Sequence, residues 1–282
     1  MKIITTNAGV RRLLDRSPGR IGLVPTMGYL HQGHLSLVKA CKRENQTTVV
    51  SVFVNPTQFA AGEDLNRYPR DLPRDARLLK KEKVDLLFAP NEKEMYPTGF
   101  LTHVRVDRLS EVLCGVSRPG HFQGVATVVA KLLNIVRPDR VYFGQKDAQQ
   151  AVIISRMVCD LNIHTRIRVL PTVRDADGLA LSSRNVYLTP AQRQAALNLP
   201  GGLQVAKRLI AGGERRSAAI RRAIAGELDR SPLIRSEYIA VVSLDRLEEL
   251  DRIDPDNTLV ACAIRVGTTR LIDNLILGDH SC

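Results

Sequence analysis

Hydrophobic and polar positions follow two alternating patterns over the first 170 residues. Short runs of Val, Ile, Leu and Phe with few polar interruptions are typical of strands that are buried on both faces of a parallel sheet. The stretches between these runs place apolar residues three and four positions apart, as at Val128, Leu132 and Ile135, which predicts amphipathic helices. Strands and helices in alternation predict a doubly wound α/β domain with a parallel sheet, a Rossmann-like architecture.

The predicted strands of this domain are residues 20–26, 47–55, 84–90, 139–144 and 164–170. The predicted helices between them are residues 34–45, 72–83, 124–138 and 147–161.

The pattern changes after residue 170. Two surface helices, residues 191–199 and 214–230, precede three predicted strands, residues 237–243, 257–266 and 269–277. This order predicts a smaller α+β domain. We therefore expect a catalytic domain over residues 1–170 and a lid domain over residues 171–282.

Composition narrows the class of protein. Hydrophobic residues make up 44% of the chain, which is typical of a globular protein. No apolar run is long enough to span a membrane, and the N-terminus lacks the features of a secretory signal. The five cysteines are scattered and form no CxxC pair, so no zinc site of that kind is predicted. We expect a cytoplasmic protein without a membrane partner.

The formal net charge of +12 permits two interpretations. It could indicate a nucleic-acid partner, or a basic surface around a site for an anionic small molecule. The basic residues are spread along the chain, and aromatic residues make up only 4% of it, so platforms for base stacking are scarce. The sequence therefore favours the small-molecule site.

The residues best suited to chemistry follow the first predicted strand, in "MGYLHQGH", residues 27–34. His31 and His34 lie at the turn into a predicted helix, where unpaired backbone N–H groups attract phosphate. Gly28 and Gly33 permit tight turns and a close approach to a ligand. One histidine at a helix start is often only a cap, but the whole segment after a buried strand predicts an anion site.

This segment resembles the HxGH signature of enzymes that bind ATP for attack at its α-phosphate. Their second mark is a basic or hydroxyl-rich loop, and "LALSSRN", residues 179–185, is similar to it. Ser182 and Ser183 offer hydroxyl donors and Arg184 a planar cation for a triphosphate.

Several longer stretches resemble the pantoate–β-alanine ligase family. They are "VPTMGYLHQGH", "SVFVNPTQF", "EDLNRYPRDLPRD", "SRPGHFQGVATVVAKLLNIVRPDRVYFGQKDAQQ" and "DGLALSSRNVYLT". The resemblance implies ATP-dependent condensation of pantoate with β-alanine, which yields pantothenate, AMP and pyrophosphate through a pantoyl-adenylate. It also implies a need for Mg²⁺ and a homodimer.

The resemblance also implies roles for residues. Those that match the ATP-binding positions are Met27, Gly28, Tyr29, Leu30, His31, Gln32, Gly33, His34, Gly144, Gln145, Lys146, Asp147, Val173, Leu181, Ser182, Ser183 and Arg184. Among them His34, His31 and Lys146 are the expected catalytic residues. Gln145 departs from the family, in which Glu is common at this position. No protein ligand of a metal is assigned.

Four residues match the pantoate and β-alanine site. Gln58 and Gln150 are expected to hold pantoate, and Val128 and Val129 to form an apolar wall beside it. Two further polar residues, Asn55 and His121, lie on Pro- or Gly-rich turns. For each of them, site lining and structural support remain equally open alternatives.

Three other functions are compatible with parts of this sequence. Another adenylyl- or cytidylyltransferase of the HxGH group is opposed by "NPTQF" and by the block from "GHFQG" to "DAQQ". A tRNA synthetase is opposed by the roughly one hundred residues that follow the predicted boundary, too few to recognise a tRNA as well. A basic nucleic-acid-binding module remains the alternative from a different class.

Overall fold

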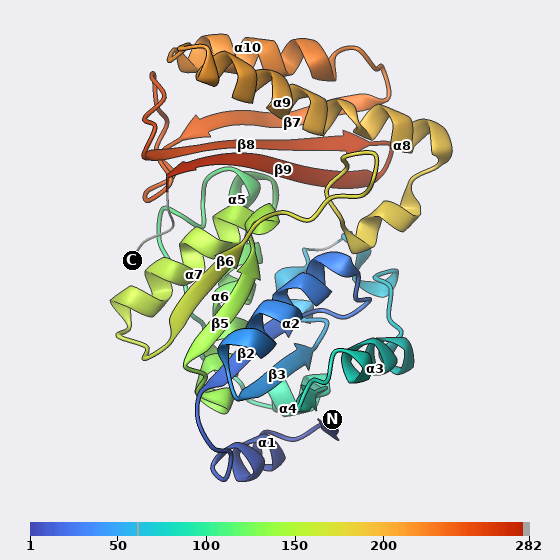
Figure 1. Ribbon diagram of the computed structural model, residues 1–282, viewed down its shortest axis with the longest axis vertical. Helices are drawn as coiled ribbons and strands as arrows, with labels where there is room; N and C mark the ends of the chain where they lie inside the picture. Colours follow the sequence, from blue (N-terminus) through green and yellow to red (C-terminus); the bar gives the residue numbers. More distant parts are fainter. Residues whose placement is uncertain (61, 279–282) are drawn as a thin grey trace. The chain divides into compact units, whose positions relative to one another are not determined.

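The computed structural model describes residues 1–60 and 62–278 (Figure 1). The chain divides into two compact units. The first consists of Met1–Glu111, Gly115–Gly144 and Ile153–Leu170, and the second of Val112–Cys114, Gln145–Val152 and Pro171–Cys282.

Among the described residues, six parallel strands form the sheet of the first unit, in the order β1–β4–β3–β2–β5–β6. The strands are β1 (Lys2–Ile4), β2 (Ile21–Thr26), β3 (Thr47–Val52), β4 (Leu86–Phe88), β5 (Arg140–Gly144) and β6 (Arg166–Leu170). From β2 the chain moves through β3 to β4, whereas from β5 it moves the other way to β6. The direction therefore reverses between β2 and β5, where open α/β sheets bind their ligands.

Side chains of the strands point alternately to the two faces of this sheet. Leu23, Val49 and Val141 pack in a core with residues of α1 (Asn7–Leu14), α6 (His121–Val136) and α7 (Ala148–Asp160). Their neighbours Val24, Val50 and Tyr142 pack in a second core with α2 (Gln32–Glu44) and α3 (Leu72–Lys81). Burial on both faces explains why these strands lack polar alternation.

The predicted doubly wound α/β class is confirmed, and so are the predicted strands and helices of this unit. β1 and α1 were not predicted. β1 has only three residues and owes its place to backbone pairing with β4, which no local pattern reports. α1 has a conventional start, because the Thr6 hydroxyl accepts a hydrogen bond from the Gly9 N–H.

The second unit contains an antiparallel sheet of β7 (Ile234–Val242), β8 (Asn257–Val266) and β9 (Thr269–Gly278). Its helices are α8 (Pro190–Ala196), α9 (Asn198–Ala211) and α10 (Ser217–Leu228), and α9 and α10 lie along one face of the sheet (Figure 1). The predicted α+β character is confirmed.

Most of α9 was not predicted, because Pro200, Gly201 and Gly202 are typical of a helix end. Pro200 is tolerated in the first turn of α9, where a missing N–H costs no intrahelical hydrogen bond. Gly202 allows α10 to approach closely, since a Cβ there would lie 3.1 Å from the Ile224 Cγ2 atom. Tertiary packing thus overrides the local breaking signal.

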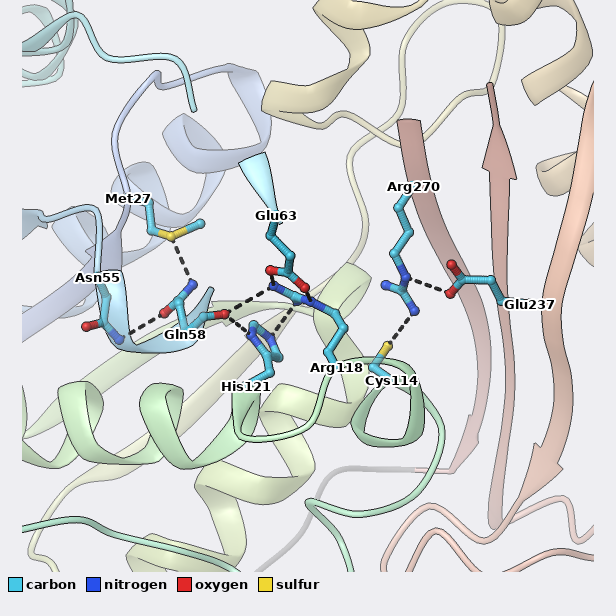
Figure 2. Close-up of polar contacts among 9 residues, drawn as sticks. All are labelled: Met27, Asn55, Gln58, Glu63, Cys114, Arg118, His121, Glu237 and Arg270. Atoms are coloured by element: carbon cyan, nitrogen blue, oxygen red, sulfur yellow. Dashed lines mark hydrogen bonds and ion pairs between the residues drawn. The ribbon is translucent and has the colours of Figure 1, made fainter. Parts of the chain in front are cut away.

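A charged cluster joins the three strands of this sheet. Glu237 of β7 forms an ion pair with Arg265 of β8, at 2.7 Å, and accepts a hydrogen bond from Arg270 of β9, at 2.8 Å. Arg270 also contacts the Cys114 Sγ atom at 3.3 Å (Figure 2), which ties residues 112–114 to this unit.

The short helical elements are η1 (Pro56–Gln58), η2 (Asp64–Asn66), α4 (Glu92–Met95), α5 (Cys114–Ser117), η3 (Gln145–Asp147) and η4 (Ser183–Tyr187). Across residues 1–60 and 62–278, none of the helices has the length and apolar character needed to cross a membrane.

Close packing of β2 on α2 predicts that Gly22→Ala destabilises the protein by about 1–3 kcal/mol. An added Cβ would lie 2.4 Å from the Cys41 Sγ atom and 2.5 Å from the Asn45 Nδ2 atom, so buried side chains must shift. The matched control is Gly226→Ala in α10, where a Cβ meets nothing within 4 Å. Because alanine favours helix, the control should be neutral or stabilising by up to about 1 kcal/mol. Thermal unfolding midpoints measure both, and equal midpoints would contradict the packing argument.

Candidate active site

The carboxyl ends of β2 and β5 lie side by side. Their parallel register pairs Gly22 with Arg140 and Leu23 with Val141, so both strands finish at the same edge of the sheet, β2 at Thr26 and β5 at Gly144. The "MGYLHQGH" segment starts directly after β2, and the "GQKD" segment includes the end of β5.

The turn after β2 depends on Gly28, whose φ is +83°. A Cβ there would lie 2.9 Å from the Val52 Cγ1 atom and 3.1 Å from an Asp75 carboxylate oxygen. The next residue, Tyr29, also has a positive φ, of +50°. Position 28 therefore requires a glycine, both for its left-handed conformation and because a Cβ would have no space.

Asp75 holds this turn from helix α3. Its fully buried carboxylate accepts hydrogen bonds from the Tyr29 N–H at 2.7 Å and the Leu30 N–H at 2.8 Å. The Arg74 guanidinium lies 3.5 Å from the same carboxylate and 5.0 Å from the centre of the Tyr29 ring. Burial raises the pKa of Asp75, and the two backbone donors and Arg74 oppose the rise.

Asp75 was not predicted as a site residue. A signal was present, since Asp75 falls between Leu72 and Leu79 at helical spacing on the apolar side of the predicted helix. A carboxylate at such a position requires hydrogen-bond donors from another element.

The two histidines form the start of α2. His31 is the N-cap, and its Nδ1 atom accepts a hydrogen bond from the Gly33 N–H at 3.2 Å. The His34 Nδ1 atom accepts from the His31 N–H at 3.3 Å, and the ring centroids are 4.1 Å apart. Because Nδ1 accepts in both rings, a neutral ring carries its proton on Nε2. The Nε2 atoms thus carry the ring protons beside the positive end of a helix.

The other residues of this segment have local roles. Leu30 is fully buried in the core beneath α2, and Gln32 is the first residue of the helix. The Met27 Sδ atom lies 2.9 Å from the Gln58 Nε2 atom, which links the segment to η1 (Figure 2).

Gln58 is held through both its side chain and its backbone. The Asn55 amide donates to the Gln58 Oε1 atom at 3.3 Å. The Gln58 carbonyl accepts from the His121 ring at 2.7 Å and from Arg118 at 3.2 Å (Figure 2). α6 can approach η1 this closely because Gly124 has no Cβ, which would lie 2.4 Å from the Thr57 carbonyl oxygen.

Arg118 is fixed in turn by Glu63, with two hydrogen bonds of 2.7 and 2.6 Å. Burial raises the pKa of Glu63, but the hydrogen bonds and charge of Arg118 outweigh burial and hold the pKa below its usual range. The two roles left open by the sequence can now be described. His121 and Asn55 both support Gln58, and Asn55 also donates to the Gly124 carbonyl at 3.1 Å.

Val128 and Val129 lie on α6 within the hydrophobic core of the first unit. They are 7% and 4% exposed, so little of either side chain is open to a ligand in this conformation.

In the second unit, the turn η3 carries Lys146, whose Nζ atom lies 3.9 Å from an Asp147 carboxylate oxygen. Helix α7 follows at once. The side chain of Gln149 is used structurally, because it accepts from the Cys114 N–H at 3.0 Å and donates to the Val112 carbonyl at 2.8 Å. Gln150, the predicted pantoate residue, is the next residue of the helix.

The other predicted ATP residues of this unit lie on one hairpin and the turn after it. The Leu181 N–H donates to the Val173 carbonyl at 3.0 Å, and Arg174 bridges to Ala180. Ser182 then caps η4, because its hydroxyl accepts from the Arg184 N–H at 3.2 Å. Ser183 is buried in this turn.

The first unit offers the imidazoles of His31 and His34, the N-terminus of α2 and the amide of Gln58. The second unit offers the ammonium of Lys146, the guanidinium of Arg184 and the amide of Gln150. These groups suit phosphate and carboxylate oxygens. Over residues 1–60 and 62–278, no group of three or more His, Cys, Asp or Glu side chains is arranged to hold a metal ion.

Relatives in sequence agree with one another. The pantothenate synthetase of Moorella thermoacetica is 54% identical over 280 residues, which cover 98% of this chain and 99% of the relative. The pantothenate synthetase of Roseiflexus castenholzii is 53% identical over 277 residues, with coverage of 98% and 99%.

Solved structures agree as well. The pantothenate synthetase of Thermus thermophilus has a TM-score of 0.94 at 48% identity, covering 99% of this chain and 100% of that one. The pantoate–β-alanine ligase of Francisella tularensis, solved with Beta-gamma ATP and β-alanine, has a TM-score of 0.80 at 36% identity, with coverage of 98% and 97%. Residues 2–276 match the profile of the pantoate–β-alanine ligase family, so the chain belongs to that family of ligases.

Proposed function

We propose that this chain condenses pantoate with β-alanine in two steps, through an enzyme-bound pantoyl-adenylate formed from ATP. The observation that carries the proposal is the histidine-capped start of α2 at the carboxyl end of β2, next to the strand that leads into Lys146. Phosphate-binding groups at the switch point of a parallel sheet suit a nucleotide.

The first step is attack of the pantoate carboxylate on the α-phosphorus of ATP, which releases pyrophosphate. Carboxylic acids titrate near pH 4, so the nucleophile is already ionised and no strong base is needed. The step requires in-line placement and neutralisation of charge on the phosphate oxygens. We assign that neutralisation to the Nε2–H groups of His31 and His34, to the helix N-terminus and to Lys146.

The remaining assignments follow the same chemistry. Ser182, Ser183 and Arg184 would contact the triphosphate. The residues of the "MGYLHQGH" and "GQKD" segments would surround the nucleotide. Gln58 and Gln150 would orient pantoate, because primary amides bind hydroxyl and carboxylate groups without adding a competing charge. The buried network around Gln58 supports its part of this proposal, since it fixes the amide before any ligand arrives.

In the second step the amine of β-alanine attacks the acyl carbon of the adenylate. AMP leaves readily, whereas the oxide of a free carboxylate would not, and this difference explains why ATP is consumed. Residues 171–282 would act as a lid that shields the adenylate from water.

Three further properties are proposed from the family. Mg²⁺ would arrive bound to the phosphates of ATP, since this ion keeps several waters and often binds through substrate phosphates. The active form would be a homodimer, and the protein would work in the cytoplasm.

His34→Ala and Lys146→Ala should each lower turnover by about a hundredfold or more, because a preorganised donor to a developing charge contributes about 3–4 kcal/mol. Steady-state pantothenate formation is the assay, and circular dichroism verifies folding. A folded variant with near-normal turnover would remove that residue from the catalytic role.

Gln58→Ala and Gln150→Ala should raise the apparent KM for pantoate far more than that for ATP. Each variant leaves a polar group of pantoate without its partner, at a cost of about 1–3 kcal/mol. Gln149→Ala is the matched control, because this neighbouring amide is engaged within the protein. Equal changes in both KM values for the Gln58 and Gln150 variants would contradict their assignment to pantoate.

The two-step order predicts exchange of labelled pyrophosphate into ATP when pantoate and Mg²⁺ are present and β-alanine is absent. Exchange should disappear when pantoate is omitted, because no adenylate can then form. A requirement for β-alanine would show that the adenylate does not precede the amine, and the order proposed here would be wrong.

A further inference from the structure

A chain of polar groups runs from β9 of the second unit to η3 and to the hairpin that precedes Ser182, Ser183 and Arg184, two segments predicted to bind phosphate. Asn274 of β9 is 6% exposed, and its Nδ2 atom donates to the carbonyl of Gln145 at 2.9 Å and to that of Lys146 at 3.0 Å. Its Oδ1 atom accepts from the Gln145 Nε2 atom at 3.2 Å. One amide thus makes three hydrogen bonds to two consecutive residues of η3.

Asp273 fixes the strand at this point. Its carboxylate is 2% exposed and accepts a hydrogen bond from the Asn274 backbone N–H at 2.8 Å. The same carboxylate forms a two-pronged ion pair with Arg174, with distances of 2.6 and 3.0 Å. Such planar pairs fix geometry as well as charge.

Arg174 lies on the hairpin that leads from Val173 to the loop of Ser182, Ser183 and Arg184. Its guanidinium also donates to the Gly178 carbonyl at 3.2 Å, across the hairpin. The hairpin is braced a second time by Arg193, which bonds Asp175 at 2.7 Å and Asp177 at 2.8 Å. Two neighbouring residues of β9 are therefore bonded to two elements of the second unit: Asn274 to η3, and Asp273 to the hairpin that carries Arg174.

We propose that Asn274 is a positioning residue for Lys146. The inference rests on the role given to Lys146 under the proposed function. η3 is a single turn between β5 and α7, and the Asn274 amide satisfies two of its carbonyls from outside the turn. Without that amide, neither carbonyl keeps this partner, and the direction of the lysine side chain is less well fixed.

Substitution of Asn274 tests the inference through pyrophosphate exchange with pantoate present. Asn274→Ala should lower the exchange rate at least about tenfold and raise the KM for ATP more than that for pantoate, because a shift of about 1 Å in a positioned group can cost a hundredfold. Asn274→Asp, which keeps the shape, should be at least as harmful, because a carboxylate oxygen would then face the two carbonyl oxygens.

Two controls separate positioning from general damage. Asn45→Ala removes a buried asparagine of similar exposure, 7%, which bonds Cys41 and Tyr142 at the far end of α2. It should lower the thermal unfolding midpoint without the selective rise in the KM for ATP. Asn274→Ala in a Lys146→Ala background should add less than about twofold, since a residue that acts through Lys146 has no effect once that lysine is absent.

The outcomes are distinguishable. If Asn274→Ala lowers exchange by the same factor in both backgrounds, Asn274 does not act through Lys146 and the inference is wrong. If Asn45→Ala reproduces the selective rise in the KM for ATP, the effect reflects the loss of any buried asparagine, and the inference is again overturned. If Lys146→Ala alone leaves exchange unchanged, the proposed role of Lys146 fails, and the positioning role fails with it.

Discussion

One buried carboxylate holds the turn that leads from β2 into the histidine-capped start of α2. Asp75 accepts hydrogen bonds from the N–H groups of Tyr29 and Leu30, in a turn where Gly28 and Tyr29 both have left-handed backbone conformations. Two backbone donors without acceptors, one of them the buried Leu30 N–H, would cost several kcal/mol, so the chain adopts this turn only while the carboxylate is in place. The turn determines where α2 begins, and the start of α2 determines where the two histidine rings lie.

The same constraint recurs at the other predicted binding segments. A side chain from a distant element satisfies backbone groups of a short turn, and the turn then presents a residue suited to the substrate. His121 and Arg118 do so for the Gln58 carbonyl, and Asn274 does so for the carbonyls beside Lys146. Short turns have few hydrogen bonds of their own, and buried partners from outside make them rigid before a ligand binds.

The contrast between local and remote interactions explains what the sequence could predict. Periodicity predicted the central strands and their helices because both faces of the sheet are buried. It missed β1, which depends on pairing with β4, and most of α9, where packing on α10 tolerates Pro200 and Gly202. The resemblance supplied the site candidates because each group lies within one contiguous motif. Residues that act across the fold were not found, since Asp75 lies 45 residues from Leu30 and Asn274 lies 129 residues from Gln145.

The most direct test of this account is amide hydrogen exchange at Tyr29 and Leu30 in Asp75→Asn. An asparagine offers one acceptor oxygen in place of two, so we expect exchange at one or both amides to accelerate about tenfold or more. Asp85→Asn is the comparison, since its carboxylate accepts the Thr48 N–H of a different strand and its loss should leave the turn protected. Unchanged protection of Tyr29 and Leu30 in Asp75→Asn would contradict the claim that this carboxylate holds the turn.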